Sequence, residues 1–313
     1  MRKSLSDFVV EAHALTKRFG KVTALDGLDL FVERGEVHGF LGPNGAGKST
    51  TIRALLGQIR LDAGHVSVLG MDAWERAVDI HERLSYVPGD TALWPGLTGG
   101  QCIDLLGGVH GSMNRRRRDE LVERFELDPS RRFRTYSKGN RQKIALIAAL
   151  ACDVEFIILD EPTSGLDPLM ESVFQQVLAE RAAQGASALL SSHILAEVEA
   201  LCARLTVVRS GRAVFTGPLE ELRDGTFTVI DAVTAGEPVG LERMSGLSGI
   251  ELRSHARGSH LTVQASAEAL PSALATVAAA RPLQLSVRPP SLEQLFLQKY
   301  AGAAETTEGG GRR

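Results

Sequence analysis

The sequence predicts an α/β fold with a largely parallel sheet, a helical insert, and a small α+β unit towards the C-terminal end. Strand-like runs alternate with helical patterns on both sides of the insert, as in parallel sheets covered by helices. A glycine-rich loop at residues 42–50 joins a strand-like run to a helical one, a unit typical of such folds. Between residues 97 and 151 helical patterning dominates, which predicts the insert.

The elements follow in a definite order. Strand-like runs are expected at 9–15, 28–32, 36–41, 65–69, 84–87, 155–159, 187–191, 205–208 and 213–215. Helical patterns are expected at 51–56, 143–151, 169–184 and 194–203 in the first part, and at 267–280 and 291–300 in the second. We therefore expect a first domain over residues 1–224, an accessory α+β domain over 225–300, and a disordered tail over 301–313.

Composition limits the classes of function. The chain has 313 residues, 43% of them apolar, with a net charge of −3 and a pI of about 6.3. No global basic field argues for nucleic acid as a partner. The three cysteines show no metal-type spacing, which favours inert thiols in a reducing cytoplasm. We expect no signal peptide, because the start of the sequence lacks an apolar h-region, and no membrane span, because no apolar run approaches about 20 residues.

The loop at residues 42–50 fits the pattern G-x-x-x-x-G-K-[ST], which cradles nucleotide phosphates. Its members are Gly42, Pro43, Asn44, Gly45, Ala46, Gly47, Lys48, Ser49 and Thr50. The glycines allow successive backbone N–H groups to point at an anion. Lys48 supplies a positive charge for the β- and γ-phosphates, and Ser49 supplies a hydroxyl for Mg²⁺. The loop predicts the phosphates of a nucleotide, with Mg²⁺, as ligands; the identity of that nucleotide as ATP is implied by the family resemblance given below.

A second constellation follows about 110 residues later, where the apolar run 156–159 ends in Asp160 and Glu161. In nucleotide hydrolases such a strand places its terminal Asp beside the Mg²⁺ of the bound nucleotide. Glu161 would then orient or deprotonate the attacking water. Alone, two acids after an apolar strand are better explained as surface charges, but the preceding phosphate loop favours the catalytic interpretation.

Residues 136–142 read Tyr-Ser-Lys-Gly-Asn-Arg-Gln and open the apolar helical run 143–151. Here the chain resembles the ATP-binding-cassette (ABC) family, whose usual signature is Leu-Ser-Gly-Gly-Gln. This copy keeps Ser137 and Gly139. A hydroxyl and an exposed N–H at a helix N-terminus suit a γ-phosphate, whereas a helix cap without a ligand is the alternative for this segment alone.

Further segments extend the resemblance over about residues 7–223. His193, after two serines, resembles the family's switch histidine, which implies contact with the γ-phosphate. Residues 164–167 resemble the loop that contacts the opposing subunit, and Phe19 stands where the family places an aromatic ring against adenine. The resemblance implies a P-loop NTPase core of the ABC ATPase type, with a helical subdomain at about 97–151 and with Lys48, Asp160, Glu161 and His193 as catalytic residues.

One position departs from the family pattern. After the strand at 84–87 the family has a glutamine that touches Mg²⁺, and this chain has Gly89 there. Glycine has no ligand atoms. Asp90, one residue later, could supply a carboxylate oxygen to Mg²⁺, and an ordinary turn aspartate is the equal alternative.

The resemblance also implies partners. Two cassettes of the family face each other head to tail, so one copy of each motif implies a homodimer with two composite ATP sites. Residues 290–297 and the signature variant resemble ATPase subunits of bacterial ABC-2-type exporters, including drug-resistance exporters. A separately encoded multi-span permease is therefore implied, with this chain in the cytoplasm on the inner face of the cell membrane.

Other interpretations of the partners remain to be weighed. Trp94 could receive a permease helix, although burial within the cassette is equally open. The arginines at 115–118 could face anionic lipid, but the acids that follow favour a solvated helix face. A rival is a soluble regulatory or nucleic-acid-acting ABC ATPase, for which the sequence shows no second cassette or basic patch. A P-loop kinase would leave Ser137 and His193 without a role.

Overall fold

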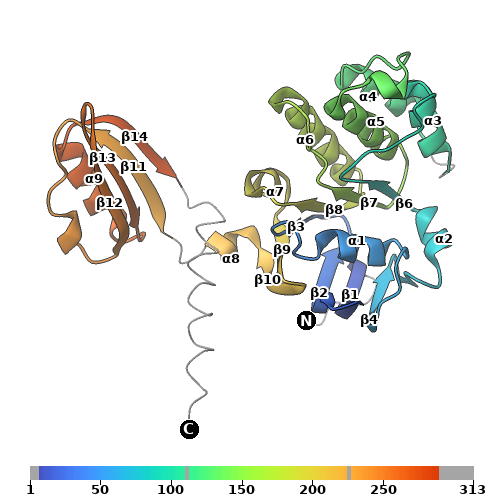
Figure 1. The fold of residues 1–313 in the computed structure, drawn as a ribbon, viewed down its shortest axis with the longest axis horizontal. Helices are drawn as coiled ribbons and strands as arrows, with labels where there is room; N and C mark the ends of the chain where they lie inside the picture. The colour runs from blue at the N-terminus through green and yellow to red at the C-terminus, as the bar shows by residue number, and fades with distance from the viewer. Residues whose placement is uncertain (1–6, 110–112, 224–226, 289–313) are drawn as a thin grey trace, which may run out of the picture. The chain divides into compact units, whose positions relative to one another are not determined.

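The computed structural model describes residues 7–109, 113–223 and 227–288, and Figure 1 shows its course. The chain divides into two compact units, Met1–Leu219 and Glu220–Arg313. The expected boundary after residue 224 lies a few residues beyond this division. The two units are taken in turn.

A six-stranded sheet of order β10-β9-β3-β8-β7-β6 forms the centre of the first unit. Its strands are β3 (Val37–Leu41), β6 (Leu84–Val87), β7 (Phe156–Asp160), β8 (Ser187–Ser192), β9 (Arg204–Arg209) and β10 (Arg212–Pro218). All neighbours pair in parallel except β9 and β10. Every residue of β3, β7 and β8 is buried, as expected for strands covered on both faces. The largely parallel sheet is confirmed.

The first strands form a sheet of their own, with the order β2-β1-β4-β5. It consists of β1 (Phe8–Phe19), β2 (Val22–Glu33), β4 (Ala63–Val68) and β5 (Met71–Asp72), with antiparallel pairing throughout. Its apolar face shares one buried cluster with α1 (Lys48–Leu55) and with Phe40, Phe156 and Leu189 of the central sheet. The packing therefore holds the loop at 42–50 between the two sheets.

Helices complete the first unit. They are α2 (Ala77–His81), α3 (Gly99–Val109), α4 (Arg115–Arg124), α5 (Lys138–Leu150), α6 (Pro168–Ala183) and α7 (Leu195–Leu201), while α8 (Leu219–Arg223) begins at the last residue of this unit. Helices α3, α4 and α5 lie together in Figure 1, beyond strand β6. They form the helical insert that the sequence predicted, around α5, whose residues 142–150 are buried. Among the described residues, no helix is long and apolar enough to cross a membrane.

The arginine run of α4 is engaged by acidic side chains. Arg117 lies 2.6 Å from Asp153, and Arg118 lies 3.1 Å from Asp104 and 2.8 Å from Asp119. These contacts favour the solvated, ion-paired helix face over a lipid-binding one.

After α8, the described part of the second unit is a four-stranded antiparallel sheet with a helix packed on it. The strands are β11 (Thr228–Thr234), β12 (Leu247–His255), β13 (Gly258–Ala265) and β14 (Pro282–Arg288), in the order β12-β13-β11-β14. Helix α9 (Leu270–Ala279) buries Ala273 and Val277 in the cluster that contains Ile230 and Leu261. The helix expected at 267–280 is therefore present over slightly fewer residues. The helix expected at 291–300 and the tail at 301–313 lie outside the described residues.

Candidate functional site

The loop at residues 42–50 depends on its glycines. Gly45 and Gly47 have φ values of +80° and +112°, in the left-handed region that favours glycine. A Cβ atom on Gly42 would lie 2.3 Å from the carbonyl oxygen of Val208, and one on Gly47 would lie 2.8 Å from that of Ala24. Neighbouring backbone therefore closes around the loop so tightly that side chains at positions 42 and 47 would distort it.

Helix α1 begins directly after the loop with its first turn open. Its first backbone bond runs from the Thr51 N–H to the Gly47 carbonyl, at 2.9 Å. No side chain of the described structure caps this N-terminus. The N–H groups of Lys48, Ser49 and Thr50 precede that bond and remain as donors. Together with the helix dipole, they make this end of α1 a site for an anion such as phosphate.

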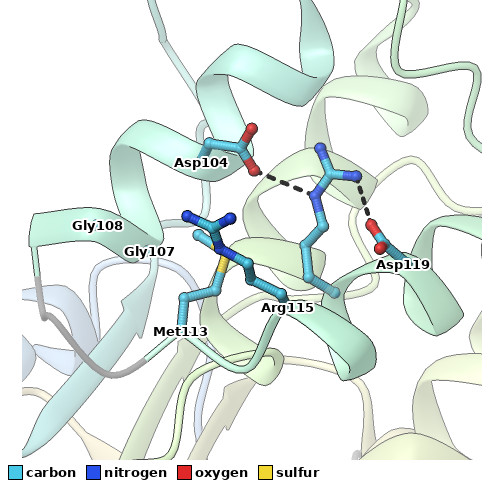
Figure 2. A pocket seen from close by; sticks show the side chains of 7 residues that line it. Asp104, Gly107, Gly108, Met113, Arg115 and Asp119 are labelled. Carbon is cyan, nitrogen blue, oxygen red and sulfur yellow. Dashed lines mark hydrogen bonds and ion pairs between the residues drawn. The ribbon is translucent and has the colours of Figure 1, made fainter.

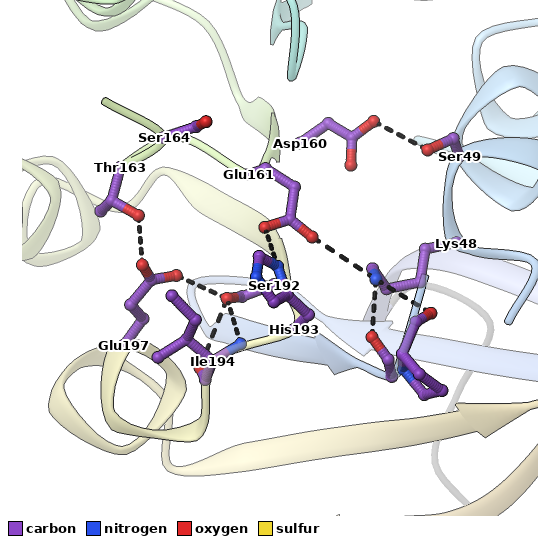
Figure 3. Close-up of polar contacts among 12 residues, drawn as sticks. Lys48, Ser49, Asp160, Glu161, Thr163, Ser164, Ser192, His193, Ile194 and Glu197 are labelled. Atoms are coloured by element: carbon purple, nitrogen blue, oxygen red, sulfur yellow. Dashed lines mark hydrogen bonds and ion pairs between the residues drawn. The ribbon is translucent and has the colours of Figure 1, made fainter. Parts of the chain in front are cut away.

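Lys48 is buried within the loop that it follows. Its side chain is 6% exposed, and Nζ donates to the carbonyl oxygen of Gly42 at 2.6 Å. The carbonyl oxygen of Pro43 and Oε1 of Glu161 each lie 3.4 Å from the same Nζ (Figure 3). The ammonium group thus stands between the loop backbone and the end of β7.

The hydroxyl of Ser49 and the carboxylate of Asp160 meet across the start of α1. Ser49 Oγ donates to Asp160 Oδ2 at 3.2 Å, whereas Oδ1 of Asp160 is buried and has no hydrogen-bond partner among the described residues. A buried, unpaired carboxylate oxygen beside a hydroxyl fits Mg²⁺, which takes hard oxygen ligands and usually keeps several waters. Burial raises the pKa of nearby Tyr86 to about 12, and the charge of Asp160 adds to the shift, so this phenol stays neutral.

Glu161 lies between two of the other candidate catalytic residues, His193 and Lys48. Its Oε2 is 2.6 Å from Nδ1 of His193, and its Oε1 faces Lys48. The φ of Glu161 is +50°, a left-handed conformation that costs about 1–3 kcal/mol in a non-glycine residue. Its N–H donates to the carbonyl of Ser191 on β8 at 3.0 Å. The neighbouring strand therefore helps to hold this conformation, and the carboxylate is placed to accept a proton while in contact with an imidazole and an ammonium group.

The structure adds three polar residues that sequence reasoning missed. Glu197, in the first turn of α7, accepts hydrogen bonds from the hydroxyls of Thr163 and Ser192 (Figure 3). Thr163 follows Glu161 by two residues, and Ser192 directly precedes His193. The sequence offered one signal for Glu197, which is that its carboxylate follows His193 by about one helical turn.

Ser137 and Gly139 form a separate group at the start of α5. Ser137 caps the helix by accepting from the Asn140 N–H at 3.3 Å. A Cβ atom on Gly139 would lie 2.2 Å from the carbonyl oxygen of Gly165, and Lys138 Nζ donates to Ser164 Oγ at 2.8 Å. The described contacts of this group run to the loop at 164–165, whereas the other candidates gather at the loop at 42–50. Phosphate-binding candidates are therefore divided between two places.

Two aromatic candidates lie at the surface. Phe19, at the end of β1, is 48% exposed, with the ammonium of Lys17 5.5 Å from its ring centre. This exposure leaves a ring face for a base to stack on. Trp94 is also 48% exposed, which favours the partner-binding alternative over complete burial within the cassette.

Gly89 and Asp90 face different surroundings. A Cβ atom on Gly89 would lie 3.3 Å from the carbonyl oxygen of Asp160 and 3.6 Å from Cβ of Glu161. Asp90 is exposed. It lines a cavity of about 190 Å³ whose other lining residues are Thr91, Tyr136, Lys138, Arg141 and Gln142. Position 89 thus faces the end of β7, and the Mg²⁺ role of Asp90 stays a prediction.

This geometry predicts that Gly89→Gln lowers the Mg²⁺ concentration needed for half-maximal ATP hydrolysis, because an amide oxygen would be introduced beside Asp160. A titration of the steady-state rate against Mg²⁺ measures the shift. Asp90→Ala is the companion variant, and unchanged Mg²⁺ dependence in it would remove Asp90 from the metal site. An unshifted titration for Gly89→Gln would show that position 89 does not reach the metal.

Another cavity, of about 600 Å³, lies in the helical insert and is not part of this site (Figure 2). Its lining residues are Asp104, Gly107, Gly108, Met113, Arg115, Arg118 and Asp119. The guanidinium of Arg118 bridges Asp104 and Asp119 there. Because that charge is balanced within the wall, the cavity gives no reason to place the chemistry in it.

Comparison with known proteins agrees with the fold and the site. A family model described as ABC transporter matches residues 25–164. The chain is 36% identical over 303 residues to the daunorubicin resistance ATP-binding protein DrrA3 of Streptomyces coeruleorubidus, covering 94% of this chain and 96% of that protein. It is 35% identical over 219 residues to the Nod factor export ATP-binding protein I of Ralstonia nicotianae, covering 68% of each.

A solved structure described as the ATP-binding subunit of an ABC transporter superposes with a TM-score of 0.65 at 30% identity. The superposition covers 69% of this chain and 92% of the solved chain. The likeness of fold, the matching motif region and the relative that aligns over nearly the whole chain agree. This chain therefore belongs to the ABC transporter family, as one of its ATP-binding, ATP-hydrolysing subunits.

Proposed function

We propose that this chain hydrolyses ATP to power export through a separate membrane permease. The observation that carries the proposal is the position of the Glu161 carboxylate, which contacts both His193 and Lys48 beside an uncapped helix N-terminus. Relatives named for daunorubicin resistance and for Nod factor export support export as the task. Because these names refer to different compounds, they do not identify the cargo of this chain, which the permease would select.

ATP is bound by its phosphates at the loop. The N–H groups at the start of α1 and the ammonium of Lys48 would hold the β- and γ-phosphate oxygens, and the exposed ring of Phe19 would stack on adenine. Lys48 already lies among backbone carbonyls, so binding replaces part of its contact with Gly42 by contacts with phosphate oxygen.

Hydrolysis then uses the residues at the ends of β7 and β8. A water oxygen attacks the γ-phosphorus in line with the bond from that phosphorus to the β–γ bridging oxygen. This bond breaks, and the bridging oxygen leaves as part of ADP. Glu161 takes the proton of that water. The imidazole of His193, held at Nδ1 by Glu161, supports the negative charge on the γ-phosphate oxygens.

Mg²⁺ would neutralise charge on the phosphates when bound. Ser49 and Asp160 would hold it, since their hydroxyl and carboxylate oxygens meet beside the loop. Among the described residues no cluster of three or more His, Cys, Asp or Glu forms a metal site. A Mg²⁺ ion shared with nucleotide phosphates needs only one or two protein ligands.

Two copies of the chain would complete the site. Ser137 and Gly139 lie at the start of α5, grouped with residues 164–165 and not with the loop at 42–50. Each could therefore reach the γ-phosphate bound to a second copy, which gives two composite sites in a homodimer. The permease would be a separately encoded multi-span protein, and the dimer would bind it at the cytoplasmic face of the membrane.

The proposal is tested by sequencing the neighbouring genes and co-expressing the chain with any multi-span membrane protein that they encode. We expect the two to purify together and to expel a fluorescent, amphipathic cargo such as daunorubicin from cells in an ATP-dependent manner. The same pair carrying Glu161→Gln is the control and is expected to accumulate the dye. Normal complex formation without export of any tested cargo would contradict the export task, and purification with ribosomes or DNA would favour the rival soluble ATPase.

A further inference from the structure

Glu197 is a buried carboxylate bound on both oxygens by hydroxyl groups. Its side chain belongs to a residue that is 8% exposed. Oε1 accepts from Thr163 Oγ1, and Oε2 accepts from Ser192 Oγ at 2.5 Å. Burying a carboxylate costs free energy unless the carboxylate is hydrogen-bonded. The two hydroxyl groups supply one hydrogen bond to each oxygen of Glu197 and so offset that cost.

The two hydroxyls belong to the segments that carry the proposed catalytic pair. Thr163 lies in the turn after β7, where the Ser164 N–H donates to the Glu161 carbonyl at 3.1 Å. Ser192 ends β8 and accepts from the Ile194 N–H at 2.9 Å, across His193. Glu197 therefore links the backbone that holds Glu161 to the backbone that holds His193, as Figure 3 shows.

We propose that Glu197 is a positioning residue for ATP hydrolysis, which sets the distance between Glu161 and His193 through Thr163 and Ser192. The inference rests on the proposed roles of those two residues. Glu161 has a left-handed backbone, and such a conformation persists only where its surroundings hold it. The bond from Thr163 supplies one such constraint, two residues after the strained position.

The chemistry of the link explains why a carboxylate is needed. Both Thr163 and Ser192 donate to Glu197, so the group between them must be an acceptor on both sides. Glutamine has the same shape but only one acceptor oxygen, and its amide would turn one of the two hydroxyls from donor to acceptor. The Ser192 hydroxyl could donate instead to the Ile194 carbonyl, 3.3 Å away, and accept from that amide. Glu197→Gln would still replace two charge-assisted hydrogen bonds with weaker neutral ones, so it is expected to loosen the link without emptying the space.

The first experiment compares full-length Glu197→Gln with the wild type. We expect kcat for ATP hydrolysis to fall about tenfold or more, with KM for ATP changed less than about twofold, since an interaction felt only in the transition state affects kcat. Glu199→Gln, on the same helix, is the matched control and is expected to keep the wild-type kcat. Melting temperatures of the variants show whether the folded state is intact.

The second experiment asks whether Glu197 acts through the catalytic pair. In a His193→Ala background, single-turnover hydrolysis should be almost insensitive to Glu197→Gln, because residues that act as a unit are non-additive. An equal fold-loss in both backgrounds would overturn the inference and leave Glu197 a purely structural residue. An unchanged kcat in Glu197→Gln would also overturn it. If instead Glu161→Gln hydrolyses ATP normally, the proposed site itself fails, which is a distinct result.

Discussion

Replacing Glu161 with glutamine is expected to lower kcat for ATP hydrolysis by about 10²–10⁴-fold, the usual contribution of a general base. The amide keeps the size of the side chain but cannot take the proton of the attacking water. It also replaces the carboxylate that lies 2.6 Å from His193 and 3.4 Å from Lys48. ATP binding should survive, because the loop and the start of α1 are untouched. Steady-state phosphate release and equilibrium binding of labelled ATP measure the two effects separately.

The same variant reports on assembly. Uncleaved ATP should keep two copies of Glu161→Gln together, so gel filtration with ATP and Mg²⁺ should show a dimer that the wild type loses as it hydrolyses. Glu171→Gln is the control, since Glu171 is also half-buried but lies in the first turn of α6. Hydrolysis at the wild-type rate by Glu161→Gln would show that another group activates the water.

The central sheet could be predicted because its signals are local. The strand β3, the loop and α1 are adjacent in the sequence, and the apolar runs of β7 and β8 read directly as buried strands. The separate antiparallel sheet could not be predicted, since the sequence of a strand-like run does not show which other strands it pairs with. Residues 8–19 pair with residues 22–33 through a short turn, but also with β4 more than 40 residues later. Only packing around the shared core decides that membership.

The candidate site divides in the same way. The loop, Asp160 and Glu161 could be identified from the residues next to them in the sequence. His193 could be identified only from the order of the motifs along the chain. Glu197 is different, because its role depends on Thr163 and Ser192, which are 34 and 5 residues away in the sequence. The close approach of Gly139 to the Gly165 carbonyl is likewise a product of tertiary packing. Sequence reasoning assigned that glycine to phosphate binding alone.

The second large effect concerns ATP binding itself. Lys48→Ala is expected to weaken ATP binding about 10–100-fold, because hydrogen bonds to a charged group contribute about 1.5–3 kcal/mol and each 1.4 kcal/mol is tenfold. The side chain of Lys48 is 6% exposed, so water that enters the space it leaves would compensate poorly for the lost interaction with the phosphates. Isothermal titration with ATP in the Glu161→Gln background measures the change without interference from hydrolysis.

The controls separate lost charge from a disordered loop. Lys48 Nζ lies 2.6 Å from the Gly42 carbonyl and 3.4 Å from that of Pro43, so its removal also frees the backbone that forms the cradle. Arg53→Ala removes an exposed cation from the last turn of the same helix and is expected to leave ATP affinity unchanged. If Lys48→Ala keeps the melting temperature of the ligand-free wild type but loses the stabilisation by ATP, the ammonium acts on the phosphates. If both variants bind ATP equally well, Lys48 serves only the loop, and the helix N-terminus holds the phosphates without it.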